Sequence, residues 1–189
     1  MEPLCGILAL QGDFACHARS LARLEIPFRE VRKAEDLEGL THLILPGGES
    51  TTLHRLGSVY GLLEPLAAAV RARLAVLGTC AGAILLGRGP EPPPRLGVVP
   101  AMVHRNAYGR QKDSFSAEIA VPSFGRSFHG IFIRAPRIEV MPGEADEFEV
   151  LATYGSDPVL VRYRRILLST FHPELTDDLR IHRYFMERV

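Results

Sequence analysis

The chain has 189 residues, 47% hydrophobic and 23% charged, which is an ordinary composition for a globular protein. Its 22 basic residues balance its 22 acidic ones, so net charge gives no reason to expect nucleic acid or an acidic membrane surface as a partner. No apolar run approaches the roughly 20 residues that cross a bilayer. The start, MEPLCGILALQGDF, has neither the basic region nor the cleavage site of a signal peptide. Three cysteines without CxxC spacing argue against a disulfide framework or a zinc knuckle. We therefore expect a cytoplasmic protein with reduced thiols and one domain over residues 1–189.

Short apolar runs alternate with helical patterns in the first half of the chain. The runs cover residues 5–10, 41–47 and 74–79 and end in glycine or turn residues, which is typical of parallel strands buried on both faces. Apolar residues at helical spacing, with His17 on the same face, predict one helix over 14–25, and a similar pattern predicts one or two more over 51–73. This alternation predicts a doubly wound α/β sheet.

The second half has a different character. Residues 87–95 form a Pro/Gly-rich loop, and shorter alternating segments follow, which predict hairpins and mixed strands. These segments cover residues 96–104, 114–121, 130–136, 148–154, 158–163 and 166–171. A closing helix is predicted over 176–189, capped by Thr176 or Asp177.

Cys80 lies in a G-x-C-x-G sequence, between the predicted strand 74–79 and a helical AILL. Glycines at 78 and 82 let a strand and a helix approach closely around a strained residue, as in a nucleophile elbow. A helix start favours the thiolate and offers backbone N–H groups to an oxyanion. The alternative is a packed core thiol, the role expected of Cys5 and Cys16.

A cysteine nucleophile needs a base, and the base needs a group that orients it. His172 and Glu174 lie two residues apart in STFHPEL, after a predicted strand. In extended chain, which Pro173 favours, both side chains lie on one face, so the carboxylate could hold the imidazole. The alternative is an incidental histidine in a solvated turn.

Two further segments present groups that suit a ligand. LPGGEST, residues 45–51, ends a strand in two glycines and begins a helix at Ser50 or Thr51. Such a loop presents backbone N–H groups to an anion or oxyanion. A helix cap alone would also explain Ser50, so the double glycine is the more specific feature. The polar stretch 104–115 contains Arg105, Arg110 and scarce amides, Asn106 and Gln111. It is either a solvated loop or, as we expect, a ligand or partner surface.

These motifs together resemble a known family. GTCAG followed by FHPE is similar to the class I, triad-type glutamine amidotransferases, which hydrolyse glutamine through Cys, His and Glu. LALQGDF, LPGGESTT, GTCAGAILL, HRNAYGRQ, FIRAP and STFHPELTDD resemble, more narrowly, the glutaminase subunits of two-component pyridoxal 5′-phosphate synthases, from residue 4 to about residue 186. The resemblance implies a flavodoxin-like three-layer sheet, mostly parallel, with some antiparallel strands in the C-terminal half.

The resemblance also implies roles for particular residues. Cys80 matches the nucleophile, His172 the base and acid, and Glu174 its orienter, while Gly48 and the N–H of Ala81 match the oxyanion hole. The residues that match the family's glutamine-binding positions are Gly48, Glu49, Ser50, Arg105, Ile133 and Arg134. A carboxylate for the ammonium of glutamine and guanidinium groups for its carboxylate suit a zwitterionic amino acid. Gln11 matches a residue near the oxyanion loop that responds to partner binding.

The implied partner is a (β/α)₈-barrel synthase subunit that receives ammonia through a protein channel and makes pyridoxal 5′-phosphate. Members of the family are largely silent until this partner orders the oxyanion loop, for which a peptide flip at residues 47–48 is plausible because glycine tolerates it. No metal and no cofactor is expected on this chain.

Three alternatives stay open on the sequence alone. The chain could be a glutaminase subunit of another pathway, such as the imidazole glycerol phosphate synthase type, although RNAYGRQ and ALQGDF favour the pyridoxal phosphate pathway. It could belong to related protease-like and stress-response proteins with a cysteine elbow, against which FHPE argues. It could also be a binding subunit without catalysis, against which the intact Cys, His and Glu argue.

Overall fold

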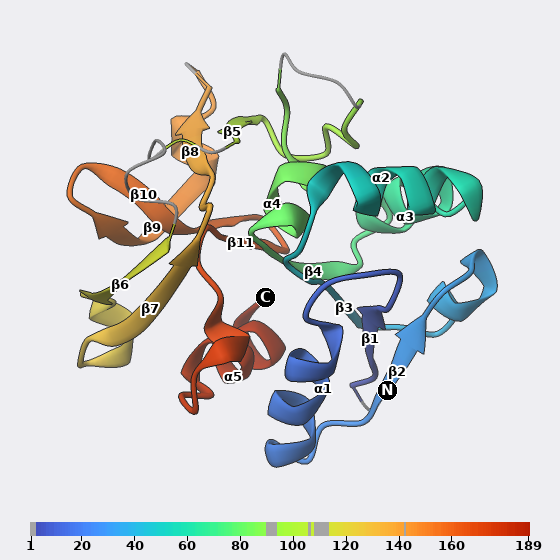
Figure 1. Cartoon of the computed structure of the whole chain (residues 1–189), viewed down its shortest axis with the longest axis horizontal. Helices are drawn as coiled ribbons and strands as arrows, with labels where there is room; N and C mark the ends of the chain where they lie inside the picture. The colour runs from blue at the N-terminus through green and yellow to red at the C-terminus, as the bar shows by residue number, and fades with distance from the viewer. Residues whose placement is uncertain (1–2, 90–93, 106, 108–113, 142) are drawn as a thin grey trace.

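A seven-stranded sheet is the centre of the computed structural model, which describes residues 3–89, 94–105, 107, 114–141 and 143–189. The strand order is β2-β1-β3-β4-β11-β10-β9; pairing is parallel from β2 to β11 and antiparallel from β11 to β9 (Figure 1). The strands are β1 (Cys5–Leu8), β2 (Phe28–Val31), β3 (His42–Leu45), β4 (Ala75–Thr79), β9 (Phe148–Tyr154), β10 (Asp157–Tyr163) and β11 (Ile166–Ser169). The predicted mixed sheet, mostly parallel with antiparallel strands late in the chain, is therefore confirmed.

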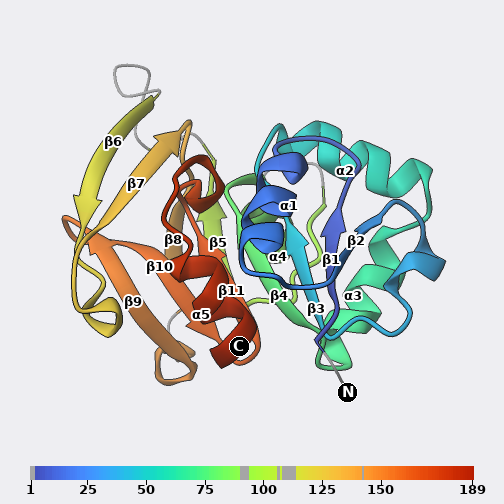
Figure 2. The same ribbon diagram turned by 90° about the horizontal axis from the view of Figure 1, so that it is seen from below.

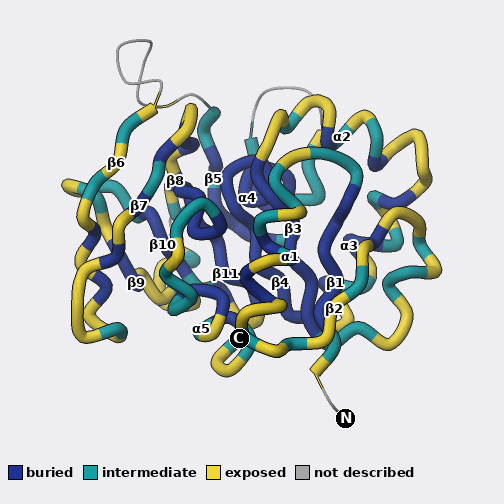
Figure 3. The backbone as a smooth tube through the Cα atoms, turned by 60° about the horizontal axis from the view of Figure 1, so that its bottom comes forward, coloured by how far each residue is buried: buried dark blue, intermediate teal, exposed yellow. Residues whose placement is uncertain are grey.

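Helices cover both faces of this sheet, because its central strands are apolar on both sides. In β3, Leu43 and Leu45 enter one core while Ile44 enters the other, as the period of two requires. The first core lies under α2, α3 and α4, and the second under α1 and α5 (Figures 1 and 2). The helices are α1 (Phe14–Arg23), α2 (Ser50–Val59), α3 (Leu63–Arg71), α4 (Ala81–Leu86) and α5 (Arg180–Arg188). Figure 3 shows that the central strands and α4 are buried, whereas α2 and α3 are partly exposed.

Two small antiparallel ladders extend the two cores. They pair β5 (Ala101–His104) with β8 (Arg137–Val140) and β6 (Ser114–Ile119) with β7 (Phe128–Ile133). Val103 and Ile138 join the core under α2 to α4, while Phe128 and Phe132 join the core under α1 and α5. Among the described residues, no helix combines the length and the apolar character needed to span a membrane.

Two predictions about elements need correction. The closing helix begins at Arg180 rather than at 176, its N-cap is Leu179, and neither Thr176 nor Asp177 caps it, because the chain first makes the short 3-10 helix η5 (Pro173–Leu175). The edge strand Phe28–Val31 was not predicted, since its residues are largely polar or exposed. By contrast, the helix predicted over 14–25 and the two-helix interpretation of 51–73 are confirmed.

Candidate active site

Cys80 lies at a tight turn between the carboxyl end of β4 and the start of α4. Its backbone is strained, with φ 45° and ψ −100°, and the residue is only 6% exposed. The flanking glycines are needed for close approach: a Cβ on Gly82 would lie 2.0 Å from the carbonyl oxygen of Leu45, and a Cβ on Gly78 would lie 2.9 Å from the carbonyl carbon of Gly82. The elbow geometry expected from G-x-C-x-G is therefore present. Of the other thiols, Cys5 is buried and burial raises its pKa, whereas Cys16 is only half-buried on α1 and not in the core.

His172 and Glu174 follow β11 and form a direct hydrogen bond. The Nδ1 atom of His172 lies 2.8 Å from Oε1 of Glu174, and both side chains are buried. The expected reason for this contact was wrong, however, because the chain is not extended there. Pro173 opens the 3-10 helix η5, since its fixed φ suits a first helical position and its missing N–H is not needed. The tight turn brings the carboxylate back to the ring.

The buried pair is strongly polarised. Burial alone would lower the pKa of His172, but the interaction with Cys80 and the hydrogen bond with Glu174 outweigh it and raise that pKa to about 10. Burial alone would raise the pKa of Glu174, but its electrostatic interactions with His17 and His172 and the hydrogen bond with His172 hold that pKa below its ordinary value. The site therefore favours an imidazolium held by a carboxylate, the charge state that stabilises a neighbouring thiolate.

Backbone contacts fix the position of the His172 ring. The backbone N–H of His172 donates to the carbonyl of Ile131 at 2.8 Å. The backbone N–H of Cys80 donates to the carbonyl of Ser169 on β11 at 2.9 Å. The ring also lies directly against Gly47, where an added Cβ would be 2.3 Å from Cε1 of His172. Glycine at 47 is therefore required by the histidine and not by a turn conformation. Neither segment's sequence indicates this contact.

The loop that matches the oxyanion hole lies next to the same ring. Gly48 has φ 135°, a conformation open to glycine, and a Cβ there would lie 2.5 Å from Oε1 of Gln11. That amide oxygen accepts the N–H of Glu49 at 3.1 Å. Gln11 thus contacts the loop at Gly48, the position that the resemblance implies for it. Ala81 is fully buried and is the first residue of α4, so its N–H has no acceptor within its own helix.

Cys80, His172 and Gly48 border a cavity of about 510 Å³. Its lining includes Cys80 and His172 as well as all six residues that were expected to hold glutamine, which are Gly48, Glu49, Ser50, Arg105, Ile133 and Arg134. Sγ of Cys80 lies 3.8 Å from the carbonyl oxygen of Ile133, so β7 closes one side of the cavity. The structure therefore brings the predicted site residues together. Asn106, Arg110 and Gln111 lie outside the described residues.

Glu49, and not Ser50, caps helix α2. Its carboxylate accepts the backbone N–H groups of Thr51 at 3.0 Å and Thr52 at 2.6 Å. Hydrogen bonds, the largest from the Thr52 hydroxyl, lower the pKa of Glu49 to about 2. Nη2 of Arg105 lies 3.8 Å from Oε1 of Glu49, so opposite charges face each other at the cavity entrance. This pairing suits a ligand that carries both an ammonium and a carboxylate.

Two residues near the site were not identified from the sequence as site residues. Asp13, the N-cap residue of α1, lines the cavity and places Oδ2 3.8 Å from Nδ1 of His172. His17, on the buried face of the same helix, lies 3.5 Å from Oε2 of Glu174. In QGD only the glutamine matched a position of the resembled family. The helical spacing assigned His17 to the apolar face of a helix. Only the long-range packing of α1 on η5 reveals either contact.

Asp13, His172 and Glu174 place one potential metal-ligating atom each within 4.8 Å of one another. Nδ1 of His172, the nitrogen nearest both carboxylates, already forms a hydrogen bond with Oε1 of Glu174 at 2.8 Å. A metal ion would need that nitrogen deprotonated and the hydrogen bond broken. The donor set is therefore better suited to proton transfer than to metal binding.

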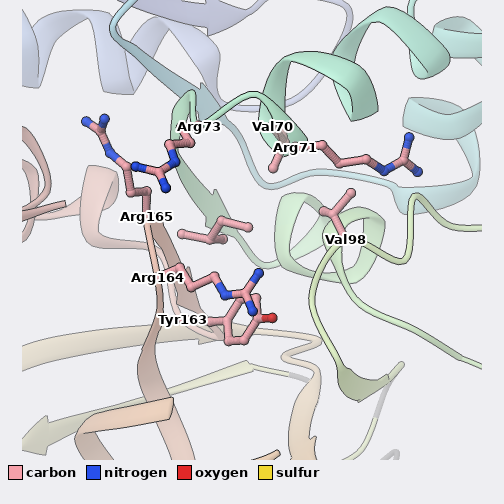
Figure 4. A pocket seen from close by; sticks show the side chains of 8 residues that line it. Val70, Arg71, Arg73, Val98, Tyr163, Arg164 and Arg165 are labelled. Atoms are coloured by element: carbon pink, nitrogen blue, oxygen red, sulfur yellow. The ribbon is translucent and has the colours of Figure 1, made fainter. Parts of the chain in front are cut away.

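A second cavity, of about 570 Å³, lies at the opposite, amino ends of β4 and β11 (Figure 4). Its lining residues are Val70, Arg71, Arg73, Val98, Tyr163, Arg164, Arg165 and Ile166, none of them a thiol or an imidazole. Arg164 lies over the ring of Tyr163 and pairs with Glu147 at 2.7 Å, and Arg71 pairs with Glu64 at 3.5 Å. The reactive groups are therefore concentrated at the carboxyl ends of the strands, where doubly wound sheets bind ligands.

A doubly wound sheet with a cysteine elbow and a buried His–Glu pair at its carboxyl edge is the arrangement that the resemblance to class I glutamine amidotransferases implies. The comparison with protein families agrees: the model of the SNO glutamine amidotransferase family matches residues 7–189, and the chain belongs to that family.

Curated relatives are similar over nearly their whole length. The chain is 53% identical to pyridoxal 5′-phosphate synthase subunit PdxT from a strain of Thermus thermophilus, covering 99% of this chain and 98% of the relative. It is 46% identical to the protein of the same name from Moorella thermoacetica, covering 97% and 98%. A solved structure titled as a glutamine amidotransferase superposes with a TM-score of 0.89 at 50% identity, covering 97% of each chain. The structure of PurLQS from Thermotoga maritima, at 15% identity and a TM-score of 0.64, covers 92% of this chain and 89% of its own and shares the fold.

Proposed function

We propose that this chain, as one amidotransferase domain over residues 1–189, hydrolyses L-glutamine to L-glutamate and ammonia as the glutaminase subunit of a pyridoxal 5′-phosphate synthase. Cys80 is the nucleophile, His172 the general acid and base, and Glu174 the group that orients His172. The observation that carries the proposal is the meeting of the strained Cys80 turn and the 2.8 Å His172–Glu174 hydrogen bond at one cavity.

The chemistry follows from these positions. Sγ of Cys80 attacks the side-chain amide carbon of glutamine, and the carbonyl oxygen becomes an oxyanion next to the N–H groups of Gly48 and Ala81. The C–N bond breaks as the imidazolium of His172 gives its proton to the leaving nitrogen, which departs as ammonia. A glutamyl thioester remains on Cys80. Water then attacks this thioester while His172 takes up one of its protons, and the C–S bond breaks to release glutamate, whose carboxyl proton goes to solvent. The Cys80 thiolate and the His172 imidazolium are restored.

The cavity entrance accounts for the choice of substrate. Glu49 offers a carboxylate to the ammonium of glutamine, and Arg105 and Arg134 offer guanidinium groups to its carboxylate. Ser50 and the backbone of Ile133 complete the pocket walls. Because Glu49 also caps α2, substrate binding and the start of that helix are coupled.

Ammonia released into water at neutral pH becomes ammonium, which is not nucleophilic, so this subunit passes it directly to a partner. The relatives at 46–53% identity are named as subunits of pyridoxal 5′-phosphate synthase, which supports a synthase subunit as that partner. We take its fold to be a (β/α)₈ barrel. Partner binding orders the loop at Gly48, and Gln11, which accepts the Glu49 N–H, is the contact through which this ordering acts.

The test is ammonia release from L-glutamine by this chain alone and mixed with the barrel synthase subunit of the same organism. Cys80→Ala serves as the catalytic control, and Cys16→Ala as the matched control for loss of a thiol outside the cavity. Release that is strong only in the mixture, lost in Cys80→Ala and retained in Cys16→Ala, supports both the triad and the activation by the partner. Equal release with and without the partner would refute the activation. No release in either case would refute the glutaminase assignment.

A further inference from the structure

Two fully buried histidines behind Glu174 have no role in the chemistry described so far. His17 comes from α1 and His182 from α5, helices that lie side by side on one face of the sheet (Figures 1 and 2). Nδ1 of His17 lies 2.9 Å from Nε2 of His182, and Nε2 of His17 lies 3.5 Å from Oε2 of Glu174. The two rings therefore form a continuous polar connection from α5 through α1 to the triad carboxylate. Burying two imidazoles is costly unless their polar atoms are used.

The two oxygens of Glu174 differ in their surroundings. Oε1 accepts from Nδ1 of His172 at 2.8 Å, whereas Oε2 is buried and has no ordinary hydrogen bond among the described residues. His17 is the donor directed at Oε2, and its 3.5 Å distance exceeds the usual range of about 2.7–3.2 Å. A buried carboxylate stays ionised only if donors or cations meet it, so Oε2 needs this partner.

The direction of the hydrogen bonds follows from the carboxylate. If Nε2 of His17 carries the proton, it donates toward Glu174, and its unprotonated Nδ1 accepts from Nε2–H of His182. The opposite arrangement would set a nitrogen lone pair against a carboxylate oxygen. Burial lowers the pKa of both histidines, that of His182 to about 3, so both rings are neutral near pH 7, as this arrangement requires. Oγ1 of Thr79 lies 3.4 Å from Nε2 of His17. A hydroxyl oxygen can accept from Nε2–H, so this contact also agrees with a proton on Nε2.

We infer that His17, oriented by His182, is a positioning residue for the glutaminase reaction: it donates Nε2–H to the Glu174 oxygen that His172 leaves free, and so keeps that carboxylate ionised and directed at His172. This inference rests on the proposed function. The connection matters because His172 gains and loses a proton in each turnover, and its partner must remain a carboxylate through both steps.

The inference predicts a change in the dependence of rate on pH. The charged and titratable groups that face this cluster come from three elements. They are the N-cap His172 and Glu174 of η5, Asp13 and His17 of α1, and His182 of α5. Removing the His17 donor leaves Glu174 buried with one oxygen unmet, which raises the pKa of the carboxyl group. The acidic limb of the kcat profile then moves to higher pH, because the protonated carboxyl no longer supports the imidazolium.

The experiment measures glutaminase kinetics of the complex with the synthase subunit across pH. His17→Leu removes the donor, while His17→Gln keeps an N–H that reaches toward Glu174. We expect His17→Leu to lower kcat about tenfold, the lower end of the loss seen when a residue that orients a metal ligand is removed, applied here by analogy. The KM for glutamine should be unchanged, and the acidic limb should move to higher pH. His17→Gln should restore most of kcat and return the limb toward its original position.

His42→Leu is the matched control. His42 is also a buried histidine, on β3, but it contacts Thr41 and Phe185 and not the triad. It should lose thermal stability without a change in the pH profile. If His17→Leu does not fold, His182→Phe replaces it: His17 then loses its orienting donor, and the acidic limb should move in the same direction by a smaller amount.

The outcomes separate the inference from the proposed function. A wild-type complex that releases ammonia, together with a His17→Leu complex of unchanged kcat and pH profile, would overturn the inference and leave the triad intact. Equal losses in His17→Leu and His17→Gln with an unmoved acidic limb would show a packing role only and would also overturn it. A wild-type complex that releases no ammonia would refute the proposed function itself.

Discussion

Replacing Gly47 by alanine is a sharp test of how His172 is positioned. The new Cβ would lie 2.3 Å from Cε1 of the ring, whereas ordinary contact begins at 3.4 Å, so the ring or the loop must move by about 1.1 Å. Misplacing a catalytic group by about 1 Å costs on the order of 100-fold in rate. The φ of Gly47 lies outside the left-handed region, so alanine is compatible with the backbone and the protein should fold.

The assay is kcat for ammonia release by the complex with the synthase subunit, alongside the thermal midpoint of the isolated chain. We expect kcat to fall about 100-fold for Gly47→Ala. The control is Gly155→Ala, at a position with φ 60° and no atom within 4 Å of the added Cβ, which should lower stability but leave kcat unchanged. A Gly47→Ala complex with wild-type kcat would refute the account of how the ring is held.

Three other substitutions test separate parts of the site. Gln11→Leu removes the acceptor of the Glu49 N–H and should reduce the activation of ammonia release by the synthase subunit, with thermal stability nearly unchanged; full activation would contradict the role of Gln11. In steady-state kinetics, Arg105→Leu should raise the KM for glutamine about tenfold or more and affect kcat less, because a charge-assisted hydrogen bond contributes about 1.5–3 kcal/mol. An unchanged KM would exclude Arg105 from glutamine binding. Glu49→Ala should lower the free energy of unfolding by about 1 kcal/mol at neutral pH through loss of the α2 cap. Folding lowers the pKa of Glu49 from 4.5 to about 2, so the extra stability of the wild type is present above pH 4.5 and disappears as the pH falls toward about 2. Denaturant titrations across this pH range measure the difference in the free energy of unfolding. A difference that does not change with pH would refute the cap.

The features that were predicted correctly from the sequence are local or periodic. The run at 41–47 indicated a strand buried on both faces, and Leu43, Ile44 and Leu45 do enter opposite cores. The spacing of Gly78, Cys80 and Gly82 predicted a tight strand-to-helix turn because only glycine permits that approach. The remaining site residues were placed through resemblance to a family, and the six expected to hold glutamine line one cavity.

The features that were missed depend on contacts between distant segments. His17 and Glu174 are far apart in sequence, and helical spacing alone assigned His17 to an apolar face. The contact of Gly47 with His172 joins two loops, so nothing in either segment predicts it. At α5, Thr176 and Asp177 have the chemistry of a cap, but η5 occupies the preceding residues and delays the helix to Arg180. Local propensity could not identify that turn.

The most direct test of the central claim is to trap the covalent intermediate. The complex with the synthase subunit is given radiolabelled L-glutamine, quenched in acid during steady-state turnover, digested and mapped by mass spectrometry. The account predicts a glutamyl thioester on the peptide that contains Cys80, present in the wild type and absent in Cys80→Ala. Turnover of glutamine with the label on another residue would contradict the assignment of Cys80 as the nucleophile.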